Sequence, residues 1–342
     1  MRRPSAQRAG MTLVELLTVI TIMVILIAVA VPVMRPALKD RKLREASRQV
    51  NTFIALAKSK AVEAGRPHGI YIARDANNPN SAYQIFLAET PLPYAGDYLG
   101  ATAKMLPGSA PTGYAGGAEL SDIQDLVNQG DYIQFAFKGP HYLITGVDEM
   151  MPPKKVYFQP APGEPWPRCS TDQANPTSLT FQVFRQPVRM ATQPMQLPTG
   201  TVIDLENSGF GVSLPNAMNG RPNAGQEFKL APDASMPADL SLGVGIGIMF
   251  TPTGSVERIY RRTYGEVANE TIHLLIGRVE QISALEPNPL KQNLRDGGTS
   301  WVSIGHQTGT VTTAENYVVN PASVTVQNAR EIAQKKQTTG GR

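Results

Sequence analysis

Residues 11–33 read MTLVELLTVITIMVILIAVAVPV, an almost unbroken apolar run of 23 residues. At about 1.5 Å of rise per residue, a helix of this length is roughly 34 Å long, enough to cross the about 30 Å hydrocarbon core of a bilayer. Ten polar and basic residues precede the run, whereas an ordinary secretory signal is shorter and is cut after its apolar region. The sequence predicts a transmembrane helix over residues 11–34 that stays in the mature protein.

One carboxylate, Glu15, lies in the apolar run, five residues from its start. A charge in a membrane segment costs on the order of 2.5–3.5 kcal/mol at the helix centre, less near its end, and generally needs a partner. A cut after Gly10 would free the α-amino group of Met11, which could pair with Glu15 of a neighbouring copy. The alternative is a carboxylate that reaches the membrane surface unaided.

The stretch GMTLVELL at residues 10–17 resembles the cleavage and methylation motif of type IV prepilins, with Met11 where the family often has Phe. The resemblance covers about the first 35 residues. It implies a role for six positions, namely peptidase cleavage between Gly10 and Met11, N-methylation of Met11, assembly through Thr12, Leu13 and Glu15, and a helix kink at Pro32.

Three later stretches, residues 55–75, 197–212 and 246–260, are similar to pseudopilins and minor pilins of the GspH/FimT type. The resemblance implies an α+β class and a type IV pilin-like fold. In that fold a long N-terminal helix, transmembrane in its first half, packs on an antiparallel β-sheet body.

Apolar residues recur at three- and four-residue steps between residues 43 and 61, which predicts an amphipathic continuation of the helix over residues 35–64. Gly65 and Pro67 are expected to end it.

The rest of the chain is rich in turns, with 30 Gly and 28 Pro in all. We expect a leader peptide over residues 1–10 and a β-rich globular domain over residues 65–320. Short strand-like runs between proline clusters predict a β-rich insertion at about residues 90–195. The polar residues 321–342 are predicted to be a flexible C-terminal tail.

The net charge is +4, but Arg2, Arg3 and Arg8 lie in the expected leader, so the mature chain would carry +1. A near-neutral body gives no general case for binding phosphate. A basic tail could still touch DNA through charge alone, and the candidate contacts are Lys335, Lys336 and Arg342.

Residues with catalytic chemistry are scattered. The four histidines have no carboxylate or cysteine at ligand spacing, and the single cysteine, Cys169, cannot form an intramolecular disulfide. We therefore expect no catalytic site, metal or cofactor.

These observations predict a structural subunit of a type II secretion or type IV pilus-like filament, and not an enzyme. The alternative is a DNA-binding minor pilin for DNA uptake. The expected partners are a prepilin peptidase, other pilin-like subunits and an inner-membrane assembly platform. The resemblance, and not the distribution of positive charges, implies a single-pass protein of the bacterial inner membrane with its body outside the cytoplasm.

Overall fold

The computed structural model describes residues 12–107, 110–121, 126–148, 155–170, 177–211, 227–229, 245–261, 265–318 and 320–338. For residues 29–38 and 337–338 it describes the backbone alone.

The helix α1 (Leu13–Ala64) is the longest element, and Gly65 ends it in a left-handed conformation at φ 63° that favours glycine. One face of its C-terminal part is a stripe of six side chains that are at most 1% exposed: Leu43, Ala46, Val50, Ile54, Ala57 and Ala61. The stripe follows the periodicity seen in the sequence, and burying it fixes this part of α1 on the body.

Two antiparallel sheets of the body share one buried core with that stripe. The first has the strand order β11-β3-β1-β14-β15-β16, with β12 also paired to β3. Its strands are β1 (His68–Ala73), β3 (Gln84–Glu89), β11 (Val188–Arg189), β12 (Met195–Gln196), β14 (Ile246–Phe250), β15 (Val256–Tyr260) and β16 (Gly265–Glu266).

The second sheet has the order β19-β18-β17-β13-β2. Its strands are β2 (Ser81–Ala82), β13 (Thr201–Phe210), β17 (Ile272–Arg278), β18 (Ser300–Ile304) and β19 (Val311–Glu315). Three 3-10 helices lie between β17 and β18, namely η1 (Val279–Gln281), η2 (Pro289–Lys291) and η3 (Asn293–Arg295).

Alternate residues of the second sheet face two different helices. Leu274 belongs to the core shared with α1, whereas Leu275 packs with Trp301 on the opposite face. Helix α2 (Val326–Thr338) covers that face with Ala329 and Ala333. The body is therefore layered, with α1 on one side of this sheet and α2 on the other.

The prediction of a flexible tail over residues 321–342 is wrong for the part that the structure describes. Residues 326–338 form α2, and the Arg330 side chain in it is fully buried. Its guanidinium donates to the backbone carbonyl of Asn207 at 2.7 Å. A polar composition hid an amphipathic helix whose buried face consists of two alanines and one arginine.

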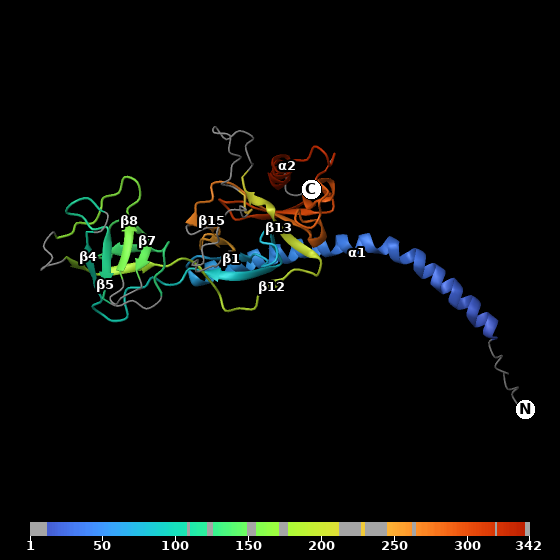
Figure 1. The fold of residues 1–342 in the computed structure, drawn as a ribbon, viewed down its shortest axis with the longest axis horizontal. Helices are drawn as coiled ribbons and strands as arrows, with labels where there is room; N and C mark the ends of the chain where they lie inside the picture. Colours follow the sequence, from blue (N-terminus) through green and yellow to red (C-terminus); the bar gives the residue numbers. More distant parts are fainter. Residues whose placement is uncertain are drawn as a thin grey trace, which may run out of the picture.

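A third sheet lies at the end of the molecule opposite to the N-terminus (Figure 1). Its order is β10-β6-β7-β8-β5-β4-β9. Its strands are β4 (Ala103–Leu106), β5 (Gly117–Leu120), β6 (Tyr132–Phe135), β7 (Tyr142–Asp148), β8 (Lys155–Gln159), β9 (Ser178–Leu179) and β10 (Phe181–Phe184).

This third sheet closes on itself. The two strands at its ends, β9 and β10, are consecutive in the chain, with only Thr180 between them. β9 pairs with β4 and β10 pairs with β6, so one extended segment completes the ring. We call this unit the distal barrel. It encloses its own buried core, which includes Phe135, Phe158 and Phe181. Closure removes the unpaired edges that would otherwise invite association.

The predicted α+β, type IV pilin-like fold is wrong. The described chain is mostly β-structure, with nineteen strands in three sheets against two α-helices and three short 3-10 helices. The prediction extended a resemblance in the first 35 residues, and in the short stretches 55–75, 197–212 and 246–260, to the whole chain. The fold of the rest of the chain is determined by pairing between strands that are distant in the sequence, and not by the N-terminal motif.

Within the described residues, no helix has an apolar stretch long enough to cross a membrane. The predictions of a transmembrane helix over residues 11–34 and of a single-pass inner-membrane protein are corrected on this finding.

Candidate assembly surface

The start of α1 is capped by the residues that precede and form its first turn. Thr12 has extended backbone angles, and its hydroxyl oxygen accepts a hydrogen bond from the backbone N–H of Glu15 at 3.3 Å. The carbonyl of Thr12 accepts from the N–H of Leu16 at 3.1 Å. Glu15 also places a carboxylate in the first turn, where the helix dipole favours negative charge.

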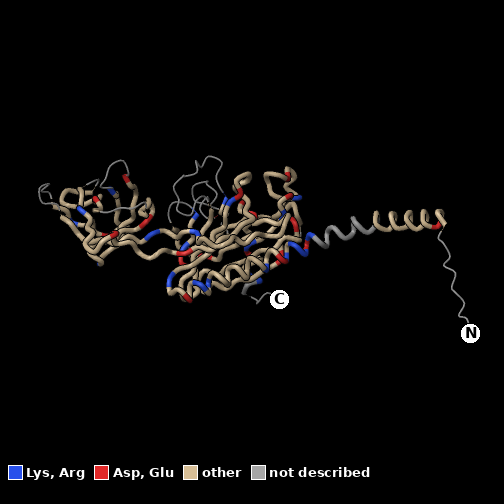
Figure 2. Tube along the Cα trace, turned by 90° about the horizontal axis from the view of Figure 1, so that it is seen from below, with Lys and Arg blue, Asp and Glu red and all other residues tan. Residues whose placement is uncertain are grey.

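Beyond the cap, α1 exposes apolar side chains on all sides. We call residues 13–28 the free half of α1. Twelve large apolar side chains in it are between 47% and 80% exposed, from Leu13 to Ile27. Figure 2 shows this coil projecting from the body with one acidic position near its N-terminal end. A helix that is apolar all round is normally buried, so this surface is suited to being covered by another molecule.

The two other polar side chains of the free half bond within the helix. The hydroxyl of Thr18 donates to the carbonyl of Glu15 at 2.9 Å, and that of Thr21 donates to the carbonyl of Leu17 at 2.8 Å. Because these hydroxyls are satisfied by the preceding turn, they do not oppose burial of the helix. Glu15 is left as the one charged group of the free half.

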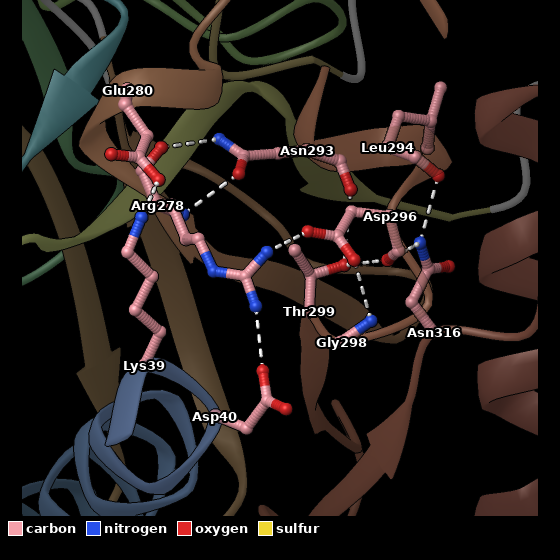
Figure 3. Close-up of polar contacts among 10 residues, drawn as sticks. All are labelled: Lys39, Asp40, Arg278, Glu280, Asn293, Leu294, Asp296, Gly298, Thr299 and Asn316. Carbon is pink, nitrogen blue, oxygen red and sulfur yellow. Dashed lines mark hydrogen bonds and ion pairs between the residues drawn. The ribbon is translucent and has the colours of Figure 1, made fainter. Parts of the chain in front are cut away.

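Where α1 meets the body, an ion-pair cluster joins it to the end of β17 (Figure 3). We define the α1 clamp as five residues: Lys39, Asp40, Arg278, Glu280 and Asp296. Nζ of Lys39 lies 2.5 Å from Oε1 of Glu280, and Nη2 of Arg278 lies 2.7 Å from Oδ1 of Asp40. The other terminal nitrogen of Arg278, Nη1, bonds Asp296. One arginine thus ties α1 to the loop before β18.

Neighbouring polar groups hold the clamp in place. The backbone N–H of Arg278 donates to Oδ1 of Asn293 at 2.8 Å, and that of Gly298 donates to Oδ1 of Asp296 at 2.8 Å. The Asn316 amide donates to the carbonyl of Leu294 at 2.8 Å. These bonds fix the Asp296 carboxylate and the backbone that carries the Arg278 guanidinium. The clamp can therefore set the direction in which α1 leaves the body.

Further along α1, polar side chains make three more contacts with the body. The hydroxyls of Ser47 and Ser300 lie 2.5 Å apart in the buried core. Asn51 donates to the Thr313 hydroxyl at 2.7 Å, and Lys58 donates to the carbonyl of Gly309 at 2.8 Å. The second half of α1 is therefore fixed along its length, in contrast to the free half.

The residues predicted for assembly are only partly described. Thr12, Leu13 and Glu15 lie at the start of the free half, and Leu13 is 80% exposed. Gly10 and Met11 lie outside the described residues, so the cleavage site is not placed. The kink predicted at Pro32 falls in the stretch of α1 whose side chains are not described.

Two of the three candidate DNA contacts, Lys335 and Lys336, are described, and both lie on α2. Lys335 forms a pair with Glu331 at 2.7 Å on the exposed side of α2, and Arg342 lies outside the described residues. Lys336 lies next to Lys335 and is half-buried. Arg330, the other basic residue of the helix, points into the body.

Two features of the site were missed in the sequence. The spacing of Thr12 and Glu15 matches the capping-box pattern, in which a threonine is followed three residues later by a glutamate. That local signal could have assigned both residues to the helix start. The clamp has no such signal, because Asp40 and Arg278 are 238 positions apart in the chain.

Histidine and cysteine side chains occupy separate structural positions. His68 lies 3.7 Å from Glu89, His141 packs against the Phe184 ring, and His273 is buried beside Ser303. Cys169 packs on the core of the distal barrel, and burial raises the pKa of its thiol. Among the residues that the structure describes, no group of three metal-ligating side chains was found.

Comparisons of the chain with protein-family models, with curated proteins and with solved structures gave no match.

Proposed function

We propose that this chain is a structural subunit of a type II secretion or type IV pilus-like filament. A prepilin peptidase cuts it after Gly10, and it assembles through the free half of α1. The observation that carries the proposal is the free half itself: twelve exposed large apolar side chains around a helix whose one charge is Glu15. Such a surface gains free energy when copies pack together, at roughly 25 cal/mol for each Å² of apolar area buried.

The clamp supports the proposal because it separates the two halves of α1. Arg278 and Lys39 hold the helix where it reaches the body, and the buried stripe holds the rest. The free half can therefore enter a shared helical core while the body and the distal barrel remain outside it. Other pilin-like subunits and an assembly platform would be its partners.

Glu15 provides the polar specificity of this assembly. Burial of its carboxylate among apolar helices is unfavourable unless a cation is next to it. The Met11 amine of a neighbouring copy would be such a cation after cleavage. The pair would fix the axial register of packed helices, which apolar contacts alone leave open to sliding.

Mass spectrometry of the protein recovered from its own cells tests this function. The expected result is a chain that begins at N-methylated Met11 and that co-purifies with other pilin-like subunits. Recovery of the uncut chain, still carrying residues 1–10 and without such companions, would overturn the proposal.

Substitution of Glu15 separates its charge from its place in the capping box. Glu15→Gln keeps a side chain that can serve at that helix position, whereas Glu15→Ala does not. If the ion pair sets the register, both variants should enter filaments at least tenfold less than the unsubstituted chain when they are co-expressed with it. Immunoblotting of sheared filaments measures the incorporation.

Glu15→Asp, which retains the charge on a shorter side chain, is the matched control and should recover part of the incorporation. Normal incorporation of Glu15→Gln together with loss of Glu15→Ala would assign Glu15 to helix capping and refute the pairing.

A further inference from the structure

Residues 227–229 form a short segment that lies against the end of β13. Glu227 pairs with Gly209 in an antiparallel bridge, and the backbone N–H of Phe228 donates to the carbonyl of Ser208 at 3.0 Å. The Phe228 side chain is 1% exposed and belongs to the core that α1 shares with two sheets of the body. The segment is therefore held as an added strand with one apolar anchor.

Two arginines of the body bond the main chain of this segment. Nη2 of Arg74 donates to the carbonyl of Phe228 at 2.6 Å, and Nη1 of Arg261 donates to the carbonyl of Glu227 at 3.0 Å. Arg261 also pairs with Glu266 at 2.6 Å, which orients its guanidinium. These bonds depend only on the segment and the residues around it, so the same segment from another copy would make them equally well.

Charged groups of both signs surround the segment. Nζ of Lys229 lies 2.6 Å from Oε1 of Glu206, and the other carboxylate oxygen of Glu206 accepts a hydrogen bond from the Ser283 hydroxyl. Burial lowers the pKa of Arg330 on α2 to about 10, and the negative charge of Glu227 opposes that shift. The surroundings therefore match an acidic, a large apolar and a basic residue in this order. We define the β13 seat as the residues that contact the segment directly: Arg74, Glu206, Ser208, Gly209 and Arg261.

The connection before the segment is longer than its own seat requires. β13 ends at Phe210, and Glu227 returns to pair with Gly209, next to that end. A hairpin of this kind needs about 2–5 connecting residues. The whole stretch 211–226 lies between the two, several times that length.

The connection after the segment is also long. Residues 230–244 lead to Gly245, whose N–H donates to the Tyr71 hydroxyl at 2.8 Å. Tyr71 lies on the same strand as the residues that lead to Arg74 of the seat, so this connection also begins and ends close to the seat. A chain of this length spans up to about 50 Å when extended. A long connection also lowers the effective concentration of the segment at its own seat.

We infer that in the assembled filament the segment 227–229 of one copy occupies the β13 seat of a neighbouring copy. The inference rests on the proposed function, which brings copies side by side. Exchange keeps every contact described above and changes only the chain that supplies it, so it costs little free energy. Each copy would give its segment to one neighbour and receive one from another. Such a head-to-tail exchange links the bodies into an open chain.

Disulfide trapping distinguishes exchange from seating within one chain. Because Phe228 bonds Ser208, Gly209 and Glu227 are a non-hydrogen-bonded pair. The Cα atoms of such a pair lie about 4.5 Å apart, within the range of about 4.4–6.8 Å that a disulfide spans. One full-length variant carries Gly209→Cys and a second carries Glu227→Cys, both with Cys169→Ser, and the two are co-expressed. Because each chain then has one cysteine, a disulfide between these positions joins two copies.

Sheared filaments are oxidised, and mass spectrometry of the linked peptides identifies the mixed dimer. The expected result is at least tenfold more mixed dimer than in a control in which Glu315→Cys replaces Glu227→Cys. Glu315 is exposed on β19, the strand at the far edge of the second sheet. Glu206→Cys with Lys229→Cys, the neighbouring pair of positions, applies the same test if Gly209→Cys does not fold.

The outcomes separate this inference from the proposed function. A chain that carries both Gly209→Cys and Glu227→Cys should give linked multimers in filaments but a cross-linked monomer before assembly. Filaments in which it gives only cross-linked monomer, with no more mixed dimer than the control, would overturn the exchange and leave the filament function standing. Failure of the unsubstituted chain to enter filaments would overturn both.

Discussion

At the scale of single residues, buried ionisable groups in the second sheet and in the distal barrel give the protein a characteristic pH dependence. Burial, together with the positive charge of Arg330, lowers the pKa of His273 to about 3, so the imidazole is neutral in the folded state. Nδ1 of its ring lies 2.9 Å from the Ser303 hydroxyl. Burial acts in the opposite direction on Asp204 and Asp131, and raises the pKa of each carboxyl to about 6.

The sign of each contribution follows from which state binds the proton. Unfolded His273, with a pKa of about 6.5, takes up a proton as the pH falls, whereas the folded form does not. Its contribution to stability is therefore complete above pH 6.5 and is lost as the pH falls toward 3. For Asp204 the folded state binds the proton more tightly, so its contribution is most favourable below pH 4 and is lost as the pH rises to about 6.

His273→Asn should change the pH dependence of stability in a defined way. The shorter amide can still reach Ser303 but loses packing against Trp301, so at pH 7 we expect it to be less stable by about 1–2 kcal/mol. The difference from the unsubstituted chain should shrink by up to about 1.4 kcal/mol for each pH unit below 6.5, and so reverse in sign before pH 4. Urea unfolding at several pH values measures it. His306→Asn, near a surface turn, is the control, and a difference that does not change with pH would contradict the assignment.

At the scale of elements, sequence patterns predicted what is local. The buried stripe of α1 follows a repeat of three and four residues, and Gly65 with Pro67 signals its end. The closure of the distal barrel was out of reach, because it depends on Leu179 pairing with Ala103 across 76 residues. α2 was missed for a different reason: its face is formed by Ala329, Ala333 and a buried arginine, which look polar and unremarkable in sequence.

The joint between α1 and β17 gives a prediction at this scale. In Arg278→Lys a single ammonium replaces the guanidinium fork and cannot hold both Asp40 and Asp296. We expect the free energy of unfolding to fall by about 1–2 kcal/mol and amide exchange to increase in α1 at residues 39–50. Lys39→Ala removes an exposed pair of the same clamp and should cost about 0.5 kcal/mol or less. Equal effects of the two substitutions would show that Arg278 does not organise the joint.

At the scale of the whole molecule, the free half of α1 and the distal barrel lie at opposite ends of the body (Figure 1). The N-terminal motif predicts a role for the first end only, and the later stretches that resemble pilins, residues 55–75, 197–212 and 246–260, all lie outside the distal barrel. The barrel has a core of its own, separate from the core under α1. A cation–π contact, with Arg258 of β15 5.8 Å from the centre of the Tyr132 ring, joins it to the body. Substitutions in the barrel should therefore change the surface that it presents without changing assembly through α1, and substitutions in the free half should leave the barrel unchanged.

Phe158→Ala tests that independence. Phe158 is 1% exposed, and its ring centre lies 5.2 Å from that of Phe135 inside the barrel. Its truncation should destabilise the barrel by about 3–5 kcal/mol. Calorimetry of the full chain should show the barrel transition shifted to lower temperature, with the body transition and incorporation into filaments unchanged. Ile248→Ala, in the core under α1, should shift the body transition alone. If Phe158→Ala lowers both transitions together, the two cores unfold as one unit and contacts such as Arg258–Tyr132 couple them strongly.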